Sequence, residues 1–216
     1  MNLQDKIKIL GLTDTGMVRE KNEDAIGYDS SLGLVVLADG MGGHRGGEIA
    51  SGITVDTIID EVQQNLPAIT SGEIDETSGF SKESICIQDA VVAANDLVYK
   101  TAEANPEHKG MGTTIVALQF YNNTFSLAHI GDSRCYRLRA DKLEQITKDH
   151  SLLQELIDRG FYTREEARNS MNKNLVTRAL GIDPVVMPDI QEDIVLKNDI
   201  YLLCSDGLTD LVEDED

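Results

Sequence analysis

Strand-like and helix-like patterns follow one another in blocks along this sequence, and their order constrains the fold more than any other feature. Two strand patterns come first, two long helical patterns follow, and three strand patterns, a polar helical stretch and one further strand pattern come after them. Their ranges are 6–12 and 32–38, 48–66 and 82–104, 112–120, 124–130 and 134–138, 151–171, and 199–204. A doubly wound fold would alternate strand and helix. The block order therefore predicts an α+β fold with antiparallel sheets and helices on their outer faces.

The composition suits one compact domain, because 41% of the 216 residues are hydrophobic. No run reaches the roughly 18 apolar residues that span a membrane, and residues 1–6 lack the profile of a secretory signal. The net charge of −19 comes with no dense cluster of Lys and Arg that could follow a nucleic-acid backbone. We therefore expect a soluble, cytoplasmic protein that binds neither nucleic acid nor a membrane.

The three cysteines, Cys86, Cys135 and Cys204, are odd in number and stand far apart within apolar runs. This spacing favours neither a disulfide framework nor a zinc site. We expect all three to be small core residues.

Two apolar strand patterns each stop at an Asp-Gly pair, Asp39-Gly40 and Asp206-Gly207. Asp-Gly is a favourable turn dipeptide, so either pair alone is explained by a turn. Two copies after buried strands instead favour a metal site. A carboxylate beside an accessible backbone carbonyl offers the oxygen ligands that a hard cation prefers.

A third acidic group lies in the loop-like stretch 13–24, where Arg19 precedes Glu23 and Asp24. One interpretation is a surface salt bridge between Arg19 and Glu23, worth about 0 to 1 kcal/mol. The other is that the acids hold a metal while the planar guanidinium of Arg19 binds a phosphate. The segment alone does not separate the two.

Taken together, four acidic or glycine-containing stretches resemble the metal-dependent protein phosphatase family, also called type 2C serine/threonine phosphatases. These stretches are 19–24, 39–43, 131–134 and 205–208, and the motifs at 112–114 and 147–151 agree with them. The Asp-Gly-Met-Gly-Gly-His form of residues 39–44 is similar to the bacterial branch of the family. The resemblance covers nearly the whole chain.

The resemblance implies a four-layer α-β-β-α sandwich of two antiparallel sheets flanked by helices, with two manganese or magnesium ions at one end. In that family pattern Asp39 bridges both ions and Asp206 binds one of them. The carbonyl of Gly40 binds the other together with Glu23 or Asp24, of which Asp24 is favoured. Asp132 matches a position that helps Asp206 to hold a third, weaker ion, and an Asp that caps a hairpin turn is the alternative.

The same resemblance implies a hydrolysis in which a metal-bridging hydroxide attacks phosphorus and Arg19 binds the phosphoryl oxygens. The general acid stays open. Relatives with His directly after Asp-Gly have a candidate there, whereas this chain has Met41. His44 could substitute, as could a metal-bound water, and an ordinary loop histidine is the alternative for His44. Residues from about 151 to 180 correspond to a flap, and His108, His129 and His150 are expected to be structural.

The sequence departs from the family pattern after Ser205-Asp-Gly. Relatives continue with a helix and a strand that carries an Asp-Asn pair, and no Asp-Asn occurs here. Three explanations compete: a truncated chain, a segment supplied by another chain, or substitution by Asp214 or Asp216. We favour truncation as the working expectation, with a monomer unless another chain supplies the strand.

Three functions compete on this reading. The first is a phosphatase acting on phosphoserine and phosphothreonine in proteins, opposing a bacterial Ser/Thr kinase or acting on its substrates. The second is a truncated or inactive phosphatase-like module that binds phosphoproteins. The third is a phosphatase of a sigma-factor regulator, which the same site would serve.

Overall fold

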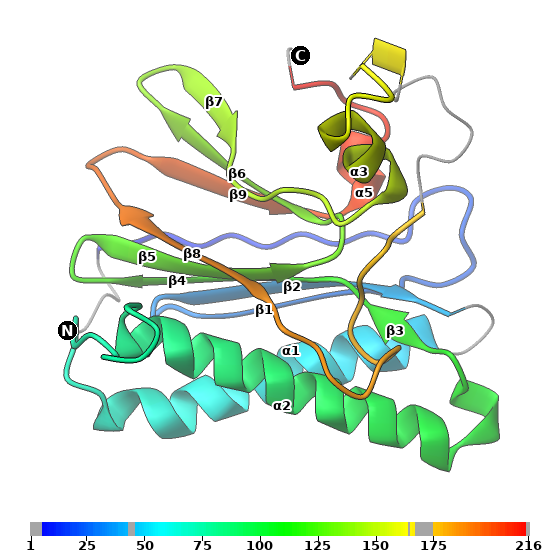
Figure 1. Cartoon of the computed structure of the whole chain (residues 1–216), viewed down its shortest axis with the longest axis horizontal. Coiled ribbons are helices and arrows are strands. Elements are labelled where there is room, and N and C mark those ends of the chain that lie inside the picture. The colour runs from blue at the N-terminus through cyan, green and yellow to red at the C-terminus, as the bar shows by residue number, and fades with distance from the viewer. Residues whose placement is uncertain (1–5, 43–45, 164, 167–174, 215–216) are drawn as a thin grey trace.

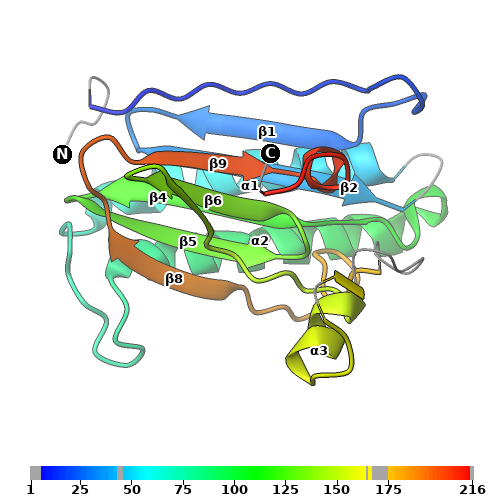
Figure 2. The same cartoon turned by 90° about the horizontal axis from the view of Figure 1, so that it is seen from above.

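Two antiparallel sheets lie face to face in the computed structural model, which describes residues 6–42, 46–163, 165–166 and 175–214. Two long helices, α1 (Gly47–Asn65) and α2 (Lys82–Ala104), cover the outer face of the larger sheet (Figure 1). The smaller sheet lies over the opposite face of the larger one, as Figure 2 shows from above. The predicted α+β class with two antiparallel sheets and flanking helices is therefore confirmed.

The larger sheet has six strands in the order β1-β2-β4-β5-β8, with β3 paired to β2. These strands are β1 (Asp24–Asp29), β2 (Leu34–Met41), β3 (Gly112–Thr113), β4 (Ile115–Tyr121), β5 (Thr124–Ile130) and β8 (Asp189–Ile194). The smaller sheet has the order β7-β6-β9, formed by β6 (Arg134–Arg139), β7 (Lys142–Gln145) and β9 (Ile200–Cys204). The shorter helical elements are η1 (Leu66–Ala68), η2 (Pro106–His108), α3 (Leu152–Asp158) and α5 (Asp206–Thr209).

Strand β4 is buried on both faces and divides the two main cores. Its residues Ile115 and Ala117 belong to the core between the larger sheet and the two long helices. Val116 and Leu118, which point to the other face, belong to the core between the sheets. Two edge-to-face ring contacts from Tyr201 of β9, at 5.2 Å to Phe120 and 5.4 Å to Phe125, complete this inter-sheet core.

The outer face of the smaller sheet differs from that of the larger one. In the described part of the chain, α3 and α5 lie at one end of this sheet and no long helix covers it (Figure 1). Ile200 and Leu202 on this face are 60% and 45% exposed. Among the described residues, no helix combines the length and apolar character that a membrane crossing needs.

The helices and the central hairpin agree with the sequence predictions. Helix α2 spans the predicted range, and α1 differs by one residue at each end. The turn between β4 and β5 consists of Asn122 and Asn123, whose φ angles of 42° and 61° are those of a tight hairpin turn. The three cysteines are buried, as expected, and burial raises the pKa of Cys135 to about 12.

The strand predictions differ from the structure in three respects: one predicted strand is absent, three strands were missed and one strand ends later than predicted. Residues 6–12 form no strand, although a side chain at Gly11 would touch Ile26 of β1, so the segment runs beside that strand. Strands β1, β7 and β8 were not predicted, and β2 does not stop at Asp39. It continues to Met41, because β3 pairs with its last residues, Gly40 with Thr113 and Met41 with Gly112.

Candidate metal centre

Asp39 lies within β2 and not in a turn, so the turn interpretation of Asp39-Gly40 is wrong. Its partner across the ladder is Asp24, the first residue of β1. Directly opposed residues of an antiparallel pair point to the same face of the sheet. The pairing therefore places two carboxylates beside each other, as the sequence motif predicted.

The backbone of Asp39 is held by two threonines, Thr113 at the end of β3 and Thr114 between β3 and β4. The Asp39 N–H donates to Oγ1 of Thr114 at 3.1 Å. The Asp39 carbonyl accepts from the Thr114 N–H at 2.9 Å and from the Thr113 hydroxyl at 2.8 Å. Since these groups are buried, they fix the direction in which the Asp39 side chain leaves the strand.

Gly40 allows the first turn of α1 to approach β2 closely. A Cβ at this position would lie 2.1 Å from the carbonyl oxygen of Gly47 and 2.6 Å from that of Glu23. The Glu23 carbonyl accepts from the Gly40 N–H at 3.0 Å and from the Ser51 hydroxyl at 2.6 Å. The Glu23 side chain lies over Gly47, where an added Cβ would be 2.5 Å from Oε1. Glu23 thus faces the start of α1, whereas Asp24 faces Asp39.

Two further carboxylates come from the other side of the sandwich. Asp206 is the first residue of α5, directly after β9, and Asp132 lies in the connection from β5 to β6. Two hydroxyl contacts join these segments to the larger sheet. Ser205 donates to Oδ2 of Asp24 at 2.9 Å, and the hydroxyls of Thr114 and Ser133 are 2.7 Å apart.

The electrostatics show that these four carboxylates act on one another. Burial, followed by the charges of Asp24, Asp206 and Asp132, raises the pKa of Asp39 to about 8. Burial, followed by the charges of Asp206 and Asp149, raises the pKa of Asp132 to about 6. The pKa of Asp206 is also raised, by burial first and then by Asp210 and Asp24. A cluster of this kind holds a proton or a cation, because unpaired carboxylates cannot all stay ionised at close range.

The remaining predicted residues are placed differently. Arg19 is exposed, and its charge opposes the rise in the pKa of Asp206, so it lies near the cluster. His44 and Asp216 lie outside the described residues. Asp214, a suggested substitute ligand, accepts a hydrogen bond from the Tyr136 hydroxyl at 2.9 Å. The flap range of about 151 to 180 contains α3, while residues 164 and 167–174 are outside the described part.

Sequence reasoning missed the residues that support the acidic cluster. Three hydroxyl groups contact the cluster or each other beside it, those of Thr114, Ser133 and Ser205. The charge of Asp210, one helical turn after Asp206, raises the pKa of Asp206. The motifs 112–114, 131–134 and 205–208 contained all three hydroxyls. Their position next to a strand end was the available signal.

A second polar cluster lies at the flap base. It consists of His129, His150 and Asp189, whose possible metal-ligand atoms all lie within 4.8 Å of one another. Among the described residues, no other group of three or more His, Cys, Asp or Glu side chains is that close. The rings of His129 and His150 are stacked at 4.7 Å, and His150 Nδ1 accepts from the Gly131 N–H at 3.1 Å. Arg178 pairs with Asp189 at 2.7 Å. These contacts agree with the structural role expected for both histidines.

Asp39 lies between two other carboxylates of the acidic cluster. A side-chain hydrogen bond with Asp24 acts on the pKa of Asp39, and one with Asp39 acts on the pKa of Asp206. A centre with two ions about 3.5 to 4 Å apart needs a bridging carboxylate of this kind between two terminal ones. The oxygen-only donor set and the raised pKa of Asp39 both fit a pair of hard cations.

The fold and the acidic cluster define a protein of the metal-dependent phosphatase class. The model of the family described as Protein phosphatase 2C matches residues 18–216, and the chain belongs to this family. Among curated relatives, it is similar to the serine/threonine protein phosphatase PstP of Mycobacterium tuberculosis, with 41% identity over 94% of this chain. The match spans only 36% of the length of that relative.

Other relatives are matched over more of their length. The serine/threonine phosphatase stp of Listeria innocua is 36% identical over 93% of this chain and 77% of its own. A crystal structure of PstP has a TM-score of 0.81 and 40% identity, covering 94% of this chain and 79% of that chain. The catalytic domain of PstP in complex with two manganese ions has a TM-score of 0.79 and 39% identity, covering 94% and 78%.

Proposed function

We propose that the chain removes phosphate from phosphoserine and phosphothreonine in proteins with the help of two manganese or magnesium ions. The observation that carries the proposal is the convergence of carboxylates from both sheets on Asp39, whose pKa rises to about 8. Membership of the phosphatase family supports the reaction class. The two manganese ions bound by the similar PstP domain support the cofactor.

The proposed roles follow the positions of the residues. Asp39 would hold both ions. Asp206 would be a ligand of one ion, and Asp24 and the Gly40 carbonyl would be ligands of the other. Glu23 is the weaker alternative to Asp24, since its side chain faces the start of α1. Asp132 would hold a third ion together with Asp206.

Bound ions of this kind supply a hydroxide at neutral pH and offset charge on the phosphoryl oxygens. The residues of the chain would hold the substrate. Arg19 is exposed near the acidic cluster, and its guanidinium would bind two phosphoryl oxygens with its planar donors. His44 stays a proposed general acid. The chain would act as a single domain, with residues of about 151 to 180 forming the flap.

The partners are part of the same proposal. Phosphorylated proteins are the substrates, including a Ser/Thr kinase or its targets, and a sigma-factor regulator is an alternative that the same site would serve. A monomeric state and a cytoplasmic location belong to this proposal as well.

The test compares the purified wild-type chain with Asp39→Asn and with Asp56→Asn, an exposed aspartate on α1 that serves as the matched control. We expect manganese-dependent release of phosphate from phosphothreonine peptides by the wild type and the control, and a loss of at least about 100-fold in Asp39→Asn, as for other groups that stabilise a transition state. Binding of the peptides without turnover at saturating manganese would support the binding-module alternative and overturn the enzymatic proposal.

A further inference from the structure

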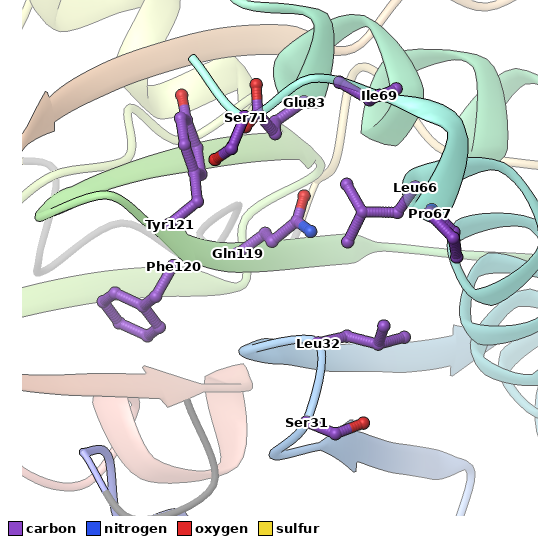
Figure 3. Close-up of a pocket in the computed structure, with 10 residues that line it drawn as sticks. All are labelled: Ser31, Leu32, Leu66, Pro67, Ile69, Ser71, Glu83, Gln119, Phe120 and Tyr121. Atoms are coloured by element: carbon purple, nitrogen blue, oxygen red, sulfur yellow. The ribbon is translucent and has the colours of Figure 1, made fainter. Parts of the chain in front are cut away.

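A cavity of about 270 Å³ lies at the end of the larger sheet that is remote from the acidic cluster (Figure 3). It is open on one side and is lined by the turn between β1 and β2, the end of β4, the connection after α1 and the first turn of α2. Leu34, opposite Gln119 of the cavity wall, is five residues before Asp39 on β2. At roughly 3.3 Å per residue, about 16 Å separates the two sites along the strand.

Glu83 is the first of two buried polar side chains in the wall that lack a full set of partners. It is only 1% exposed and belongs to the first turn of α2, where the helix dipole favours a negative charge. Its Oε1 accepts from the Ser71 hydroxyl at 2.8 Å and from the Gly72 N–H at 2.9 Å. Its Oε2 has no hydrogen-bond partner among the described residues.

Gln119 is the second of these side chains, and it is completely buried. Both its amide oxygen and its amide nitrogen lack hydrogen-bond partners in the described part of the chain. Figure 3 shows its carboxamide between Tyr121 and Leu66, directed toward the space in front of β4. A buried amide without partners is rare, because the lost hydration is not replaced.

A neighbouring carboxylate shows that the fold can satisfy such a group here. Glu192 accepts from the Ser81 N–H at 2.8 Å, from the Ser81 hydroxyl at 2.6 Å and from the Ser84 hydroxyl at 2.5 Å. These three contacts come from the start of α2, the element that also carries Glu83, and the Tyr121 hydroxyl adds a longer one at 3.5 Å. Glu83 and Gln119, in contrast, keep polar atoms without partners among the described residues.

We propose that this cavity binds a small organic cation, an ammonium or amidinium group with a short apolar body. Its N–H groups would donate to Oε2 of Glu83 and to the amide oxygen of Gln119. None of the ten lining residues is basic, so the negative charge of Glu83 has no counter-ion in the wall. Leu32, Leu66 and Ile69 offer apolar contacts to the body of the ligand.

The size of the cavity limits the ligand. At roughly 30 Å³ for each non-hydrogen atom, it holds a compound of about ten such atoms. Benzamidine meets this limit and carries an amidinium that can donate two parallel hydrogen bonds to a carboxylate. Benzamide is its neutral counterpart and benzoate its anionic one, so the three separate the effect of charge from that of shape.

The test is a titration of the ¹⁵N-labelled full chain with each compound, at saturating magnesium so that the acidic cluster does not attract the cation. We expect benzamidine to shift the Gly72 N–H and the Gln119 side-chain amide signals saturably, at least tenfold more tightly than benzamide, with no shift by benzoate. Glu83→Gln should weaken benzamidine at least tenfold, because its amide oxygen keeps the bonds from Ser71 and Gly72 but the charge is gone. Asp39→Asn should bind benzamidine like the wild type.

Other outcomes would overturn the proposal. A cavity that holds only water would give no saturable shift with any of the three compounds. Equal binding of all three, or unchanged binding in Glu83→Gln, would show that Glu83 does not recognise a cation. Loss of the shifts in Asp39→Asn would place benzamidine at the acidic cluster. If Glu83→Gln fails to fold, Gln119→Met, which keeps the size of the side chain without its polar atoms, should weaken benzamidine instead.

Discussion

Replacing Asp39 with Asn is expected to stabilise the protein in the absence of metal and to abolish its stabilisation by manganese. Burial and the neighbouring carboxylates raise the pKa of Asp39 to about 8. Between pH 3.8 and about 8, the Asp39 carboxyl therefore stays protonated in the folded protein, whereas the same group is ionised in the unfolded chain. The stability of the metal-free protein falls as the pH rises from 3.8 toward about 8, and an uncharged side chain removes this loss.

The magnitude follows from the size of the pKa change. A rise from 3.8 to about 8, at roughly 1.4 kcal/mol for each tenfold change in proton affinity, sets an upper limit of about 6 kcal/mol. Water and side-chain movement reduce this value, because Asp39 is only partly buried. We expect about 1 to 3 kcal/mol, which raises the melting temperature by about 2 to 10 °C for a chain of this length.

The assay is thermal unfolding of the wild type, Asp39→Asn and the control Asp56→Asn at pH 6 and pH 8, with EDTA and then with manganese. Manganese at 100 times its dissociation constant should stabilise the wild type by about 2.7 kcal/mol and Asp39→Asn by almost nothing. The gain of Asp39→Asn over the wild type in EDTA should be larger at pH 8 than at pH 6. A metal-free melting temperature of Asp39→Asn equal to or below that of the wild type at pH 8 would refute the reasoning.

Three further predictions concern groups around the acidic cluster and in the cores. Thr114→Val should lower the free energy of unfolding by about 1 to 3 kcal/mol in urea, since the Asp39 N–H and the Ser133 hydroxyl lose their buried partner; an unchanged unfolding midpoint would contradict this. Gly40→Ala should destabilise by about 3 kcal/mol, because its Cβ would lie 2.1 Å from the Gly47 carbonyl oxygen, and urea unfolding with native-like stability would argue against the close approach. Burial raises the pKa of the three cysteine thiols to about 11 or 12, so they should resist a disulfide reagent at pH 8 and react in denaturant. Rapid labelling of the folded chain would contradict their burial.

The helices and the central hairpin could be predicted because their signals are local. The apolar spacing of α2 repeats over 23 residues, and the pair Asn122-Asn123 suits a turn with two positive φ angles. Strands β1 and β8 lack such signals. Both lie at the edges of the larger sheet, and sequences such as Asp-Ile-Gln-Glu-Asp-Ile are strands only because a neighbour pairs with them.

The sequence indicated which carboxylates form the acidic cluster but not which structural elements hold them. Strand-end motifs indicated Asp39 and Asp206, yet the first lies inside a strand and the second begins a helix. What decides this is pairing between distant segments, such as Gly40 with Thr113. The bond from Ser205 to Asp24 joins residues 181 positions apart, and no local pattern contains it.

The core between the two sheets has a consequence for the tuning of the acidic cluster. Asp24 and Asp39 belong to one sheet, whereas Asp206 follows a strand of the other. The packing of Phe120 and Phe125 against Tyr201 lies toward the far end of this core, and the inter-sheet core as a whole sets how far apart the two halves of the cluster stand. Variants that change the volume of this core would move the two sheets relative to each other and so change the spacing of the cluster, with every carboxylate left intact.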